Sequence, residues 1–246
     1  MRRISFFRYI IVTQGAAVFV TWKPQSDLIE RLDPGFTHPA YDALLGECAA
    51  KLTPLSEFIT HITYGAIVTG VSPENDPEGL PLIGQGALRH SGVDLSGCVK
   101  VPADSPWALE RATAQRGDLL MARSGTGSLE KNRLAVYHLD EPAVVDCWVD
   151  LVRLGGIEPD FVAAFLKTRF GWAQIHRLTN GVGPANLSFD EIRSLRVPVG
   201  EHELEARIVE RYGREVLPLH NSGRFDEATE AMRTIVRELT TALRVS

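Results

Sequence analysis

Four stretches of the chain differ in how hydrophobic and polar positions alternate. Residues 6–12 and 18–20 are β-branched and aromatic and are separated by a turn at Gln14-Gly15, which predicts two strands. Apolar residues at helical spacing predict helices over 26–32 and 39–51. From 55 to about 155 the apolar runs are short and Gly, Pro, Asp and Asn separate them, which predicts short strands at 66–68, 80–83, 119–121, 134–137 and 144–152.

The pattern becomes helical after Gly155-Gly156. Apolar residues recur at helical spacing over 159–177, and a strand is predicted at 196–199. Between them, Ser188 begins a short helix with Glu191 at the capping-box position. The mixture of short strands and short helices predicts an α+β fold rather than repeated βαβ units.

The C-terminal stretch predicts a pair of antiparallel helices. One seam has 3-4-3-4-3 spacing, and four apolar residues at i+4 intervals precede it: the seam is Phe225, Ala228, Met232, Ile235, Leu239 and Ala242, and the preceding set is Leu204, Ile208, Tyr212 and Val216. A helical hairpin folded on its own domain and a partner-binding coiled coil both fit this pattern. We therefore expect a lead-in segment over 1–54, a strand-rich domain over 55–200 and a helical appendage over 201–246.

Composition and motifs exclude several classes of protein. The 246 residues include 26 Lys+Arg, 31 Asp+Glu and three Cys without a CxxC pair, so neither a zinc site nor a disulfide framework is indicated, and a cytoplasmic location is expected. Arg8 and Gln14 interrupt the apolar N-terminal run, which argues against a signal peptide or membrane span. No GxGxxG, P-loop, HExxH or GxSxG motif occurs, so no catalytic residue, metal or cofactor is predicted.

The net charge of −5 hides two basic segments. Residues 111–133 and 163–200 each carry a net +3, whereas 134–162 carries −5. Both basic segments contain polar loops whose side chains are suited to base edges, since Arg pairs with guanine and Asn with adenine. Such loops are also ordinary turns, so the loops alone leave both interpretations open.

An ordered set of motifs resembles the target recognition domain of the specificity (S) subunits of Type I restriction-modification systems. The resemblance covers roughly residues 30–200. It rests on a lead-in over 30–39 (ERLDPGFTHP), on 55–65 (LSEFITHITYG), 81–86 (PLIGQG) and 116–127 (RGDLLMARSGTG), on a strand slot at 146–154, and on the closing segment from 160 to 198 with its loop at 180–186.

The resemblance implies sequence-specific recognition of double-stranded DNA without catalysis. It implies an adenine methyltransferase (M) partner, since the chain has no N-P-P-[YF] or D-P-P-[YF] tetrapeptide, and in full complexes a restriction (R) subunit. The segment 201–246 is similar to the helical spacer that docks the methyltransferase. Full S subunits have two recognition domains and two spacers, whereas this chain has one of each. A homodimer, a half-subunit and a remnant all fit, and residues 1–25 lie outside the resemblance.

These considerations give a set of expected contacts. For DNA they are Arg123, Ser124, Thr126, Lys131, Asn132, Arg133, Asn180 and Asn186, with Arg89, Lys167, Arg169 and Arg177 as phosphate-positioning residues; for the partner they are Phe225, Met232, Ile235 and Leu239. The substitution Arg123→Ala is expected to weaken binding to the cognate site by about 1–3 kcal/mol.

Two alternatives remain open at this stage. One is a metal-dependent nuclease that would use acidic residues such as Asp76 and Glu78 on the same domain. The other is a protein-interaction module that acts through its C-terminal helices and does not bind DNA.

Overall fold

The computed structural model describes residues 6–12, 18–24, 39–125, 131–179 and 186–244. The chain divides into two compact units, 1–48 and 49–246. In the first unit, β1 (Phe6–Val12) pairs with β2 (Val18–Pro24) in an antiparallel hairpin, and α1 spans Pro39–Gly46. The two predicted strands are confirmed. The helix predicted over 39–51 is shorter than expected, and the one predicted over 26–32 lies outside the described residues.

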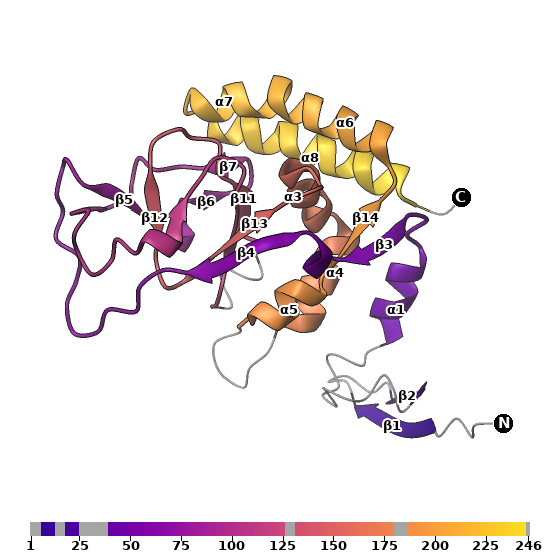
Figure 1. Ribbon diagram of the computed structural model, residues 1–246. Helices are drawn as coiled ribbons and strands as arrows, with labels where there is room; N and C mark the ends of the chain where they lie inside the picture. The colour runs from indigo at the N-terminus through magenta and orange to yellow at the C-terminus, as the bar shows by residue number, and fades with distance from the viewer. Residues whose placement is uncertain (1–5, 13–17, 25–38, 126–130, 180–185, 245–246) are drawn as a thin grey trace. The chain divides into compact units, whose positions relative to one another are not determined.

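Two four-stranded sheets form the strand-rich part of the second unit (Figure 1). One is antiparallel in the order β11-β10-β13-β4, with β4 at Ile59–Tyr64, β10 at Leu119–Ala122, β11 at Leu134–Val136 and β13 at Val149–Leu154. The other has the order β8-β5-β12-β9, with β5 at Leu80–Ile83, β8 at Lys100–Val101, β9 at Thr113–Ala114 and β12 at Ala143–Val145. Its β5 and β12 are parallel, and its other pairs are antiparallel.

Two further strand pairs complete this unit. They are β6 (Leu88–Arg89) with β7 (Gly92–Val93), and β3 (Lys51–Pro54) with β14 (Arg196–Val199). The strand predicted at 66–68 is wrong. Only Ala66 makes a bridge, to Asp146, and the side chain of Ile67 is 67% exposed, because this segment has no neighbouring strand on which to pack.

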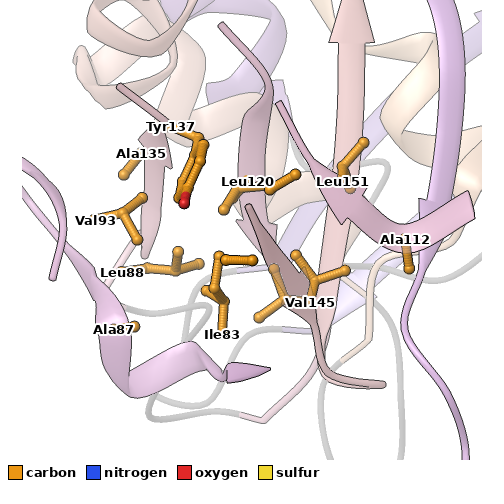
Figure 2. Close-up of a cluster of buried hydrophobic side chains, with 13 residues drawn as sticks. Ile83, Ala87, Leu88, Val93, Ala112, Leu120, Ala135, Tyr137, Val145 and Leu151 are labelled. Atoms are coloured by element: carbon orange, nitrogen blue, oxygen red, sulfur yellow. The ribbon is translucent and has the colours of Figure 1, made fainter. Parts of the chain in front are cut away.

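Side chains from both sheets meet in one buried cluster (Figure 2). Ile83 and Val145 come from the mixed sheet, and Leu120 and Leu151 come from the antiparallel sheet; all four are fully buried. The ring of Tyr137 is also enclosed, and its hydroxyl donates to the backbone oxygen of Glu141 at 2.6 Å. Burying large apolar side chains stabilises such a core by about 1.5–3 kcal/mol each.

Three short helices follow the sheets. They are α3 (Pro159–Lys167), α4 (Arg169–Leu178) and α5 (Phe189–Ser194). Thr168 caps α4 by accepting from the backbone N–H of Gly171 at 3.3 Å. Gly171 is required at this corner, because a Cβ there would lie 2.3 Å from the Cα of Leu166. The continuous helix predicted over 159–177 is therefore two helices.

The C-terminal segment packs on the rest of the unit. It consists of α6 (His202–Arg211), a π-helical turn (Tyr212–Val216), α7 (Leu217–Asn221) and α8 (Phe225–Ala242). Both α6 and α8 contact α3, and they lie side by side in Figure 1. Within the described ranges, no helix combines the length and the apolar character needed to cross a membrane.

The seam of α8 faces this intramolecular core. Met232, Ile235 and Leu239 are at most 2% exposed, and Phe225 is half-buried and contacts Arg89 and His220. The prediction that these residues bind a partner is therefore corrected for Met232, Ile235 and Leu239, because the chain's own core already buries them; for the half-buried Phe225 it stays a prediction. The 3-4-3-4-3 pattern reports burial, and it does not distinguish a partner from the chain's own domain.

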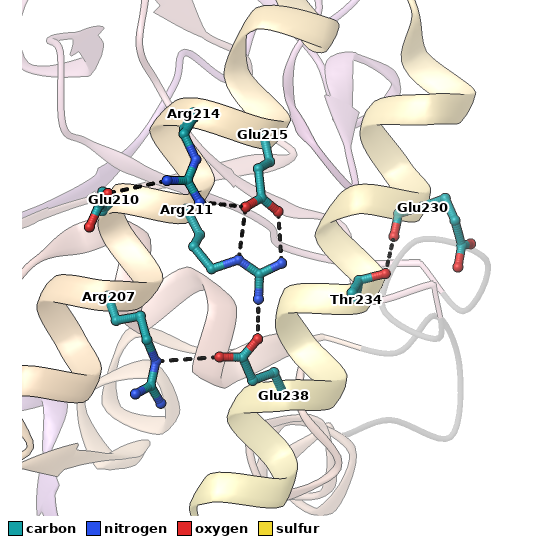
Figure 3. A network of polar contacts seen from close by, with 8 residues as sticks. All are labelled: Arg207, Glu210, Arg211, Arg214, Glu215, Glu230, Thr234 and Glu238. Atoms are coloured by element: carbon teal, nitrogen blue, oxygen red, sulfur yellow. Dashed lines mark hydrogen bonds and ion pairs between the residues drawn. The ribbon is translucent and has the colours of Figure 1, made fainter.

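The outer face of α6 and α8 carries a network of charged side chains from α6, the π-helical turn and α8 (Figure 3). Glu238 of α8 pairs with both Arg207 and Arg211 of α6. Arg211 also binds Glu215 at 2.7 Å through a two-pronged contact. Guanidinium hydrogen bonds hold the pKa of Glu215 at about 2. This network ties α6 to α8 over the buried seam.

Candidate nucleic-acid interface

The start of one polar loop that was predicted to contact DNA lies beside the end of the other. Ser124, after β10, forms an antiparallel bridge with Asn186, just before α5. The backbone N–H of Leu187 donates to the oxygen of Arg123 at 3.1 Å. Thr126 and Asn180 lie outside the described residues. The bridge brings together the ends of two segments that are about 60 residues apart in sequence.

Gln85 adds a third segment to this place. Its side-chain amide donates to the backbone oxygen of Ser124 at 2.9 Å and to that of Trp148 at 3.0 Å. The Trp148 side chain is 55% exposed, and its backbone oxygen also accepts from the N–H of Arg123. Gln85 lies in the motif at 81–86 and Trp148 in the strand slot at 146–154, but neither was predicted as a contact. A large exposed aromatic beside polar loops is common at binding surfaces, but sequence alone does not reveal its exposure.

Arg123 is held inside this surface by a buried carboxylate. Its Nη1 lies 2.8 Å from Oδ1 of Asp150, which is fully buried on β13. The guanidinium stacks 4.0 Å from the ring of Tyr64 and 5.3 Å from that of Phe189. Only 23% of its side chain is exposed. Part of the Arg123 guanidinium therefore stabilises the fold by pairing with Asp150, and only the remaining part can contact a ligand.

The carboxyl group of Asp150 is buried and therefore costly to ionise, even beside Arg123. Burial raises the pKa of its carboxyl to about 7, while the charge and hydrogen bond of Arg123 act in the opposite direction. Its Oδ2 has no hydrogen-bond partner among the described residues. Because a buried carboxylate without its cation is costly, Arg123 contributes to stability as well as to the charge of the surface.

Local structure explains how Tyr64 and Phe189 reach Arg123. Tyr64 ends β4, and Phe189 begins α5; their rings lie 5.7 Å apart. The capping box predicted for α5 is confirmed, because Ser188 accepts from the N–H of Glu191 and the Glu191 carboxylate accepts from the N–H of Ser188. Fixing the first turn of α5 fixes the position of Phe189.

Arg111 is a further cation beside the same tyrosine. Its Nη1 donates to the backbone oxygen of Tyr64 at 2.7 Å and to the hydroxyl of Thr63, and its guanidinium lies 5.7 Å from the Tyr64 ring. Arg111 is exposed. It was counted in the basic segment 111–133 but was not proposed as a contact, because its distance in sequence from the glycine-rich loop concealed its position.

The predicted residues 131–133 have different roles. Lys131 is exposed and makes no ion pair with any described residue. The Asn132 amide donates to the backbone oxygen of Leu166 at 2.9 Å, and its φ of 48° places it in the left-handed region that asparagine tolerates. Arg133 donates to the backbone oxygens of Gln85 and Leu88. Asn132 and Arg133 therefore hold the backbone that presents Lys131.

The predicted phosphate-positioning role of Lys167 is corrected. The residue ends α3, is 9% exposed, and donates its amine to the backbone oxygen of Leu134. Burial lowers the pKa of this amine to about 7. Lys167 is thus a buried internal donor. Arg169 and Arg177 of α4 are half-buried, and Arg89 pairs with Asp94 at 2.7 Å and stacks over Phe225 at 4.0 Å.

The acidic stretch at 74–78 forms a turn. Asp76 accepts from the N–H of Glu78 at 3.1 Å, and Asn75 accepts from the N–H of Lys100. Within the described part of the chain, no group of three or more His, Cys, Asp or Glu side chains is placed to hold a metal ion.

Together these features define a class of protein: an α+β domain with an aromatic and cationic loop surface and a helical appendage packed on its core. Neither a protein-family model nor a curated protein matches the sequence. Three similar solved structures are a chain studied for complex assembly and conformational transition of the type I R-M system, the S subunit of a Type-I restriction-modification system from M. genitalium, and the HsdS subunit from Thermoanaerobacter tengcongensis.

The likeness to these structures is distant. Their identities are 13%, 11% and 15%, their TM-scores are 0.46, 0.45 and 0.46, and the matches cover 85%, 71% and 84% of this chain, in the same order. The matches cover 50%, 41% and 49% of the solved chains, so this chain spans about half their length or less.

Proposed function

We propose that this chain is a DNA-recognition subunit that selects a double-stranded target for a partner adenine methyltransferase. The ordered motifs over 30–198 are the basis of the proposal, and the observation that carries it is the Ser124–Asn186 bridge. This bridge joins the ends of two loops that belong to separate motifs and to separate basic segments. A surface that reads several neighbouring base pairs requires such convergence.

Arg123, Arg111 and Lys131 supply positive charge in this region, while Ser124, Asn186 and Trp148 supply polar and aromatic contacts. The chain is expected to perform no chemistry itself and to depend on the methyltransferase, and in a restriction complex on a nuclease subunit. One recognition domain would read a half-site, and a two-fold homodimer would read two. Docking of the methyltransferase would use the charged outer face of α6 and α8, because the seam is buried.

Selection from a random duplex pool tests this function. The full chain is incubated with the pool, with and without an adenine methyltransferase that co-purifies with it, and the retained duplexes are sequenced. Enrichment of one motif is expected, and methylation of an adenine within it is expected when the methyltransferase is present. Retention of random sequence only, under both conditions, would refute sequence recognition. Addition of Mg²⁺ to the retained duplexes tests for nicking by the alternative nuclease.

Trp148→Ala tests the surface itself. The side chain is 55% exposed, so its truncation should leave the fold intact, and affinity for the selected motif should fall about tenfold if the indole contacts DNA. Trp172→Ala is the matched control, because Trp172 is also exposed but stacks on His176 within α4 at a ring distance of 4.8 Å. Equal affinities of the two variants would remove Trp148 from the interface.

A further inference from the structure

A basic pocket lies where the helical appendage meets the strand-rich part of the second unit. Its volume is about 310 Å³, at the lower end of the range for ligand sites. Arg89 and His90 line it from β6 and the turn after it, Lys131 and Arg133 from the segment before β11, and Phe225 and Asp226 from the first turn of α8. No sequence motif indicated it, because these three segments are far apart along the chain.

Internal contacts hold two of its cations in place. Arg89 donates to Asp94 at 2.7 Å and lies 4.0 Å from the Phe225 ring, and Arg133 Nη1 donates to the backbone oxygen of Gln85 at 3.2 Å. A fixed guanidinium loses less side-chain entropy when it binds a ligand than a mobile one does. Lys131 is exposed at the pocket and has no ion pair among the described residues, so its charge is available.

The other lining groups set the charge of the pocket. Burial and the neighbouring Lys167 and Arg233 lower the pKa of His90 to about 3, so this ring is neutral at pH 7 and adds no charge to the pocket. Asp226 opposes one cation and Asp94 neutralises another. Among the lining side chains, three cations (Arg89, Lys131 and Arg133) face one carboxylate, Asp226, so the pocket keeps a positive charge that suits an anion such as a phosphodiester.

The start of α8 favours an anion as well. Its N-cap, Arg224, makes no side-chain capping bond, and this 18-residue helix begins at the pocket wall. Uncapped N–H groups and the helix dipole attract negative charge at such a terminus. Asp226 supplies some of that charge within the chain, but the terminus still adds to the effect of the three basic side chains.

We propose that this pocket binds a backbone phosphate of the DNA duplex, so that the helical appendage is itself part of the DNA-binding surface. The inference rests on the proposed DNA-recognition function. A phosphate at this position would fix the duplex against the first turn of α8, while the loops at Ser124 and Asn186 read bases. A contact of this kind orients the protein on DNA without contributing to sequence preference.

Opposite charge changes at the pocket provide the test. Binding of the full chain to a labelled duplex is measured by fluorescence anisotropy from 50 to 300 mM salt, with the selected motif and with random sequence. Lys131→Gln should weaken binding to both duplexes about five- to tenfold and should lower the slope of log affinity against log salt by about one. Asp226→Asn should tighten binding about two- to fivefold, because it removes a carboxylate from the pocket.

Lys51→Gln is the matched control. Lys51 is exposed on β3, close to Ala49, whose N–H donates to the oxygen of Leu243 at the far end of α8. Since α8 has 18 residues with a rise of about 1.5 Å each, the two lysines are separated by roughly the length of that helix. This substitution should change affinity less than twofold and should leave the salt slope of the full chain unchanged.

Each outcome separates this inference from the proposed function. If the unaltered chain binds neither duplex at 50 mM salt, DNA recognition fails before the variants are compared. If it binds, but Asp226→Asn does not tighten binding or Lys131→Gln behaves as Lys51→Gln does, the phosphate pocket is refuted and DNA recognition stands. Inorganic phosphate, compared with chloride at equal ionic strength, distinguishes a free-anion site. Thermal stabilisation by phosphate that is lost in Lys131→Gln, without any change in DNA affinity, would overturn the assignment to DNA.

Discussion

Arg123 is an arginine with two roles that compete for the same guanidinium. Its Nη1 compensates Asp150, which is fully buried, while the stack on Tyr64 restricts how the remaining nitrogen atoms face outward. Removing one partner of a buried ion pair leaves a charge in a poor solvent and typically costs 3–5 kcal/mol. A loss of DNA binding in Arg123→Ala would therefore mix a lost contact with a damaged fold.

Arg123→Met separates the two effects through pH. Burial raises the pKa of Asp150 to about 7, above its unfolded value near 4, so the folded state holds a proton that the unfolded state releases, and stability falls as the pH rises from 4 to 7. Without Arg123 this pKa rises further and the decline continues above pH 7. We expect a loss of about 3–5 kcal/mol at pH 8 and a smaller loss at pH 5, measured by urea unfolding.

The control for this prediction is the pair of neutral variants. Asp150→Asn alone should remove the decline between pH 4 and 7. Arg123→Met combined with Asp150→Asn should be more stable at pH 8 than Arg123→Met alone, because no charge is then left uncompensated. A loss in Arg123→Met that is the same at pH 5 and pH 8 would show that the pair contributes packing rather than charge compensation.

Residue types at this surface were predictable, but their environments were not. A glycine-rich loop with Arg123, Ser124 and Lys131 is visible in the sequence, and Lys131 is exposed as a DNA contact would be. The partner of Arg123 is 27 residues away, and the partner of Asn132 is 34 residues away. Nothing local marks such pairs, and nothing in its spacing distinguishes the buried Lys167 from an exposed lysine.

At the scale of secondary-structure elements, the sequence predicted best those features whose determinants lie within a few neighbouring residues. The capping box at Ser188 and the strand at 196–199 are confirmed, because a cap and a short apolar run are complete within a few residues. The single helix predicted over 159–177 is interrupted near its middle, where Thr168 caps a second helix. The chain can turn there because residue 171 is glycine and has no Cβ to collide with Leu166. The seam of α8 is confirmed from Ala228 to Leu239, whereas Ala242 is exposed and Leu243 is buried in its place; the surface that the seam covers depends on the whole fold.

Ile235→Ala tests what the α8 seam does. Ile235 is fully buried against the chain's own core, so its truncation should cost about 2–5 kcal/mol in the free energy of unfolding of the isolated protein. Val236→Ala is the matched control, because Val236 is half-buried on the same helix outside the seam and should cost less than about 1.5 kcal/mol. Both are measured by urea unfolding at pH 7.

A different result would restore the seam as an interface. If Ile235→Ala abolished methyltransferase binding and left the stability of the isolated chain unchanged, the seam would not be packed in the free protein. Because the predicted cost comes from a cavity in an intramolecular core, it should appear without any partner present.

At the scale of the whole molecule, buried hydrogen bonds between distant residues attach the appendage to the domain. Tyr212 donates its hydroxyl to the backbone oxygen of Ser91 at 2.9 Å. His220 donates through Nε2 to the oxygen of Val93 at 3.0 Å, and its Nδ1 lies 2.9 Å from the Ser91 hydroxyl. These residues are more than 120 positions apart, which explains why the sequence could indicate a helical pair but not its docking. The net charge of −5 includes acids of the appendage that are paired with its own arginines, among them Glu210, Glu215 and Glu238 (Figure 3).

Removal of the appendage should therefore unfold the second unit rather than release an independent domain. A chain that ends at Gly200 lacks the helices that pack on α3, so the fully buried side chains of Phe161, Phe165 and Leu166 would lose cover. The backbone oxygens of Ser91 and Val93 would also lose their hydrogen-bond donors, Tyr212 and His220. Exposing even two or three large apolar side chains costs about as much as a typical net stability of 5–15 kcal/mol. We expect the shortened chain to lose its cooperative thermal transition and near-ultraviolet circular dichroism, whereas a chain that lacks only residues 245–246 should keep both. A sharp transition in the shortened chain would show instead that the strand-rich part folds alone, and the phosphate pocket at Lys131 would then form only when the appendage docks.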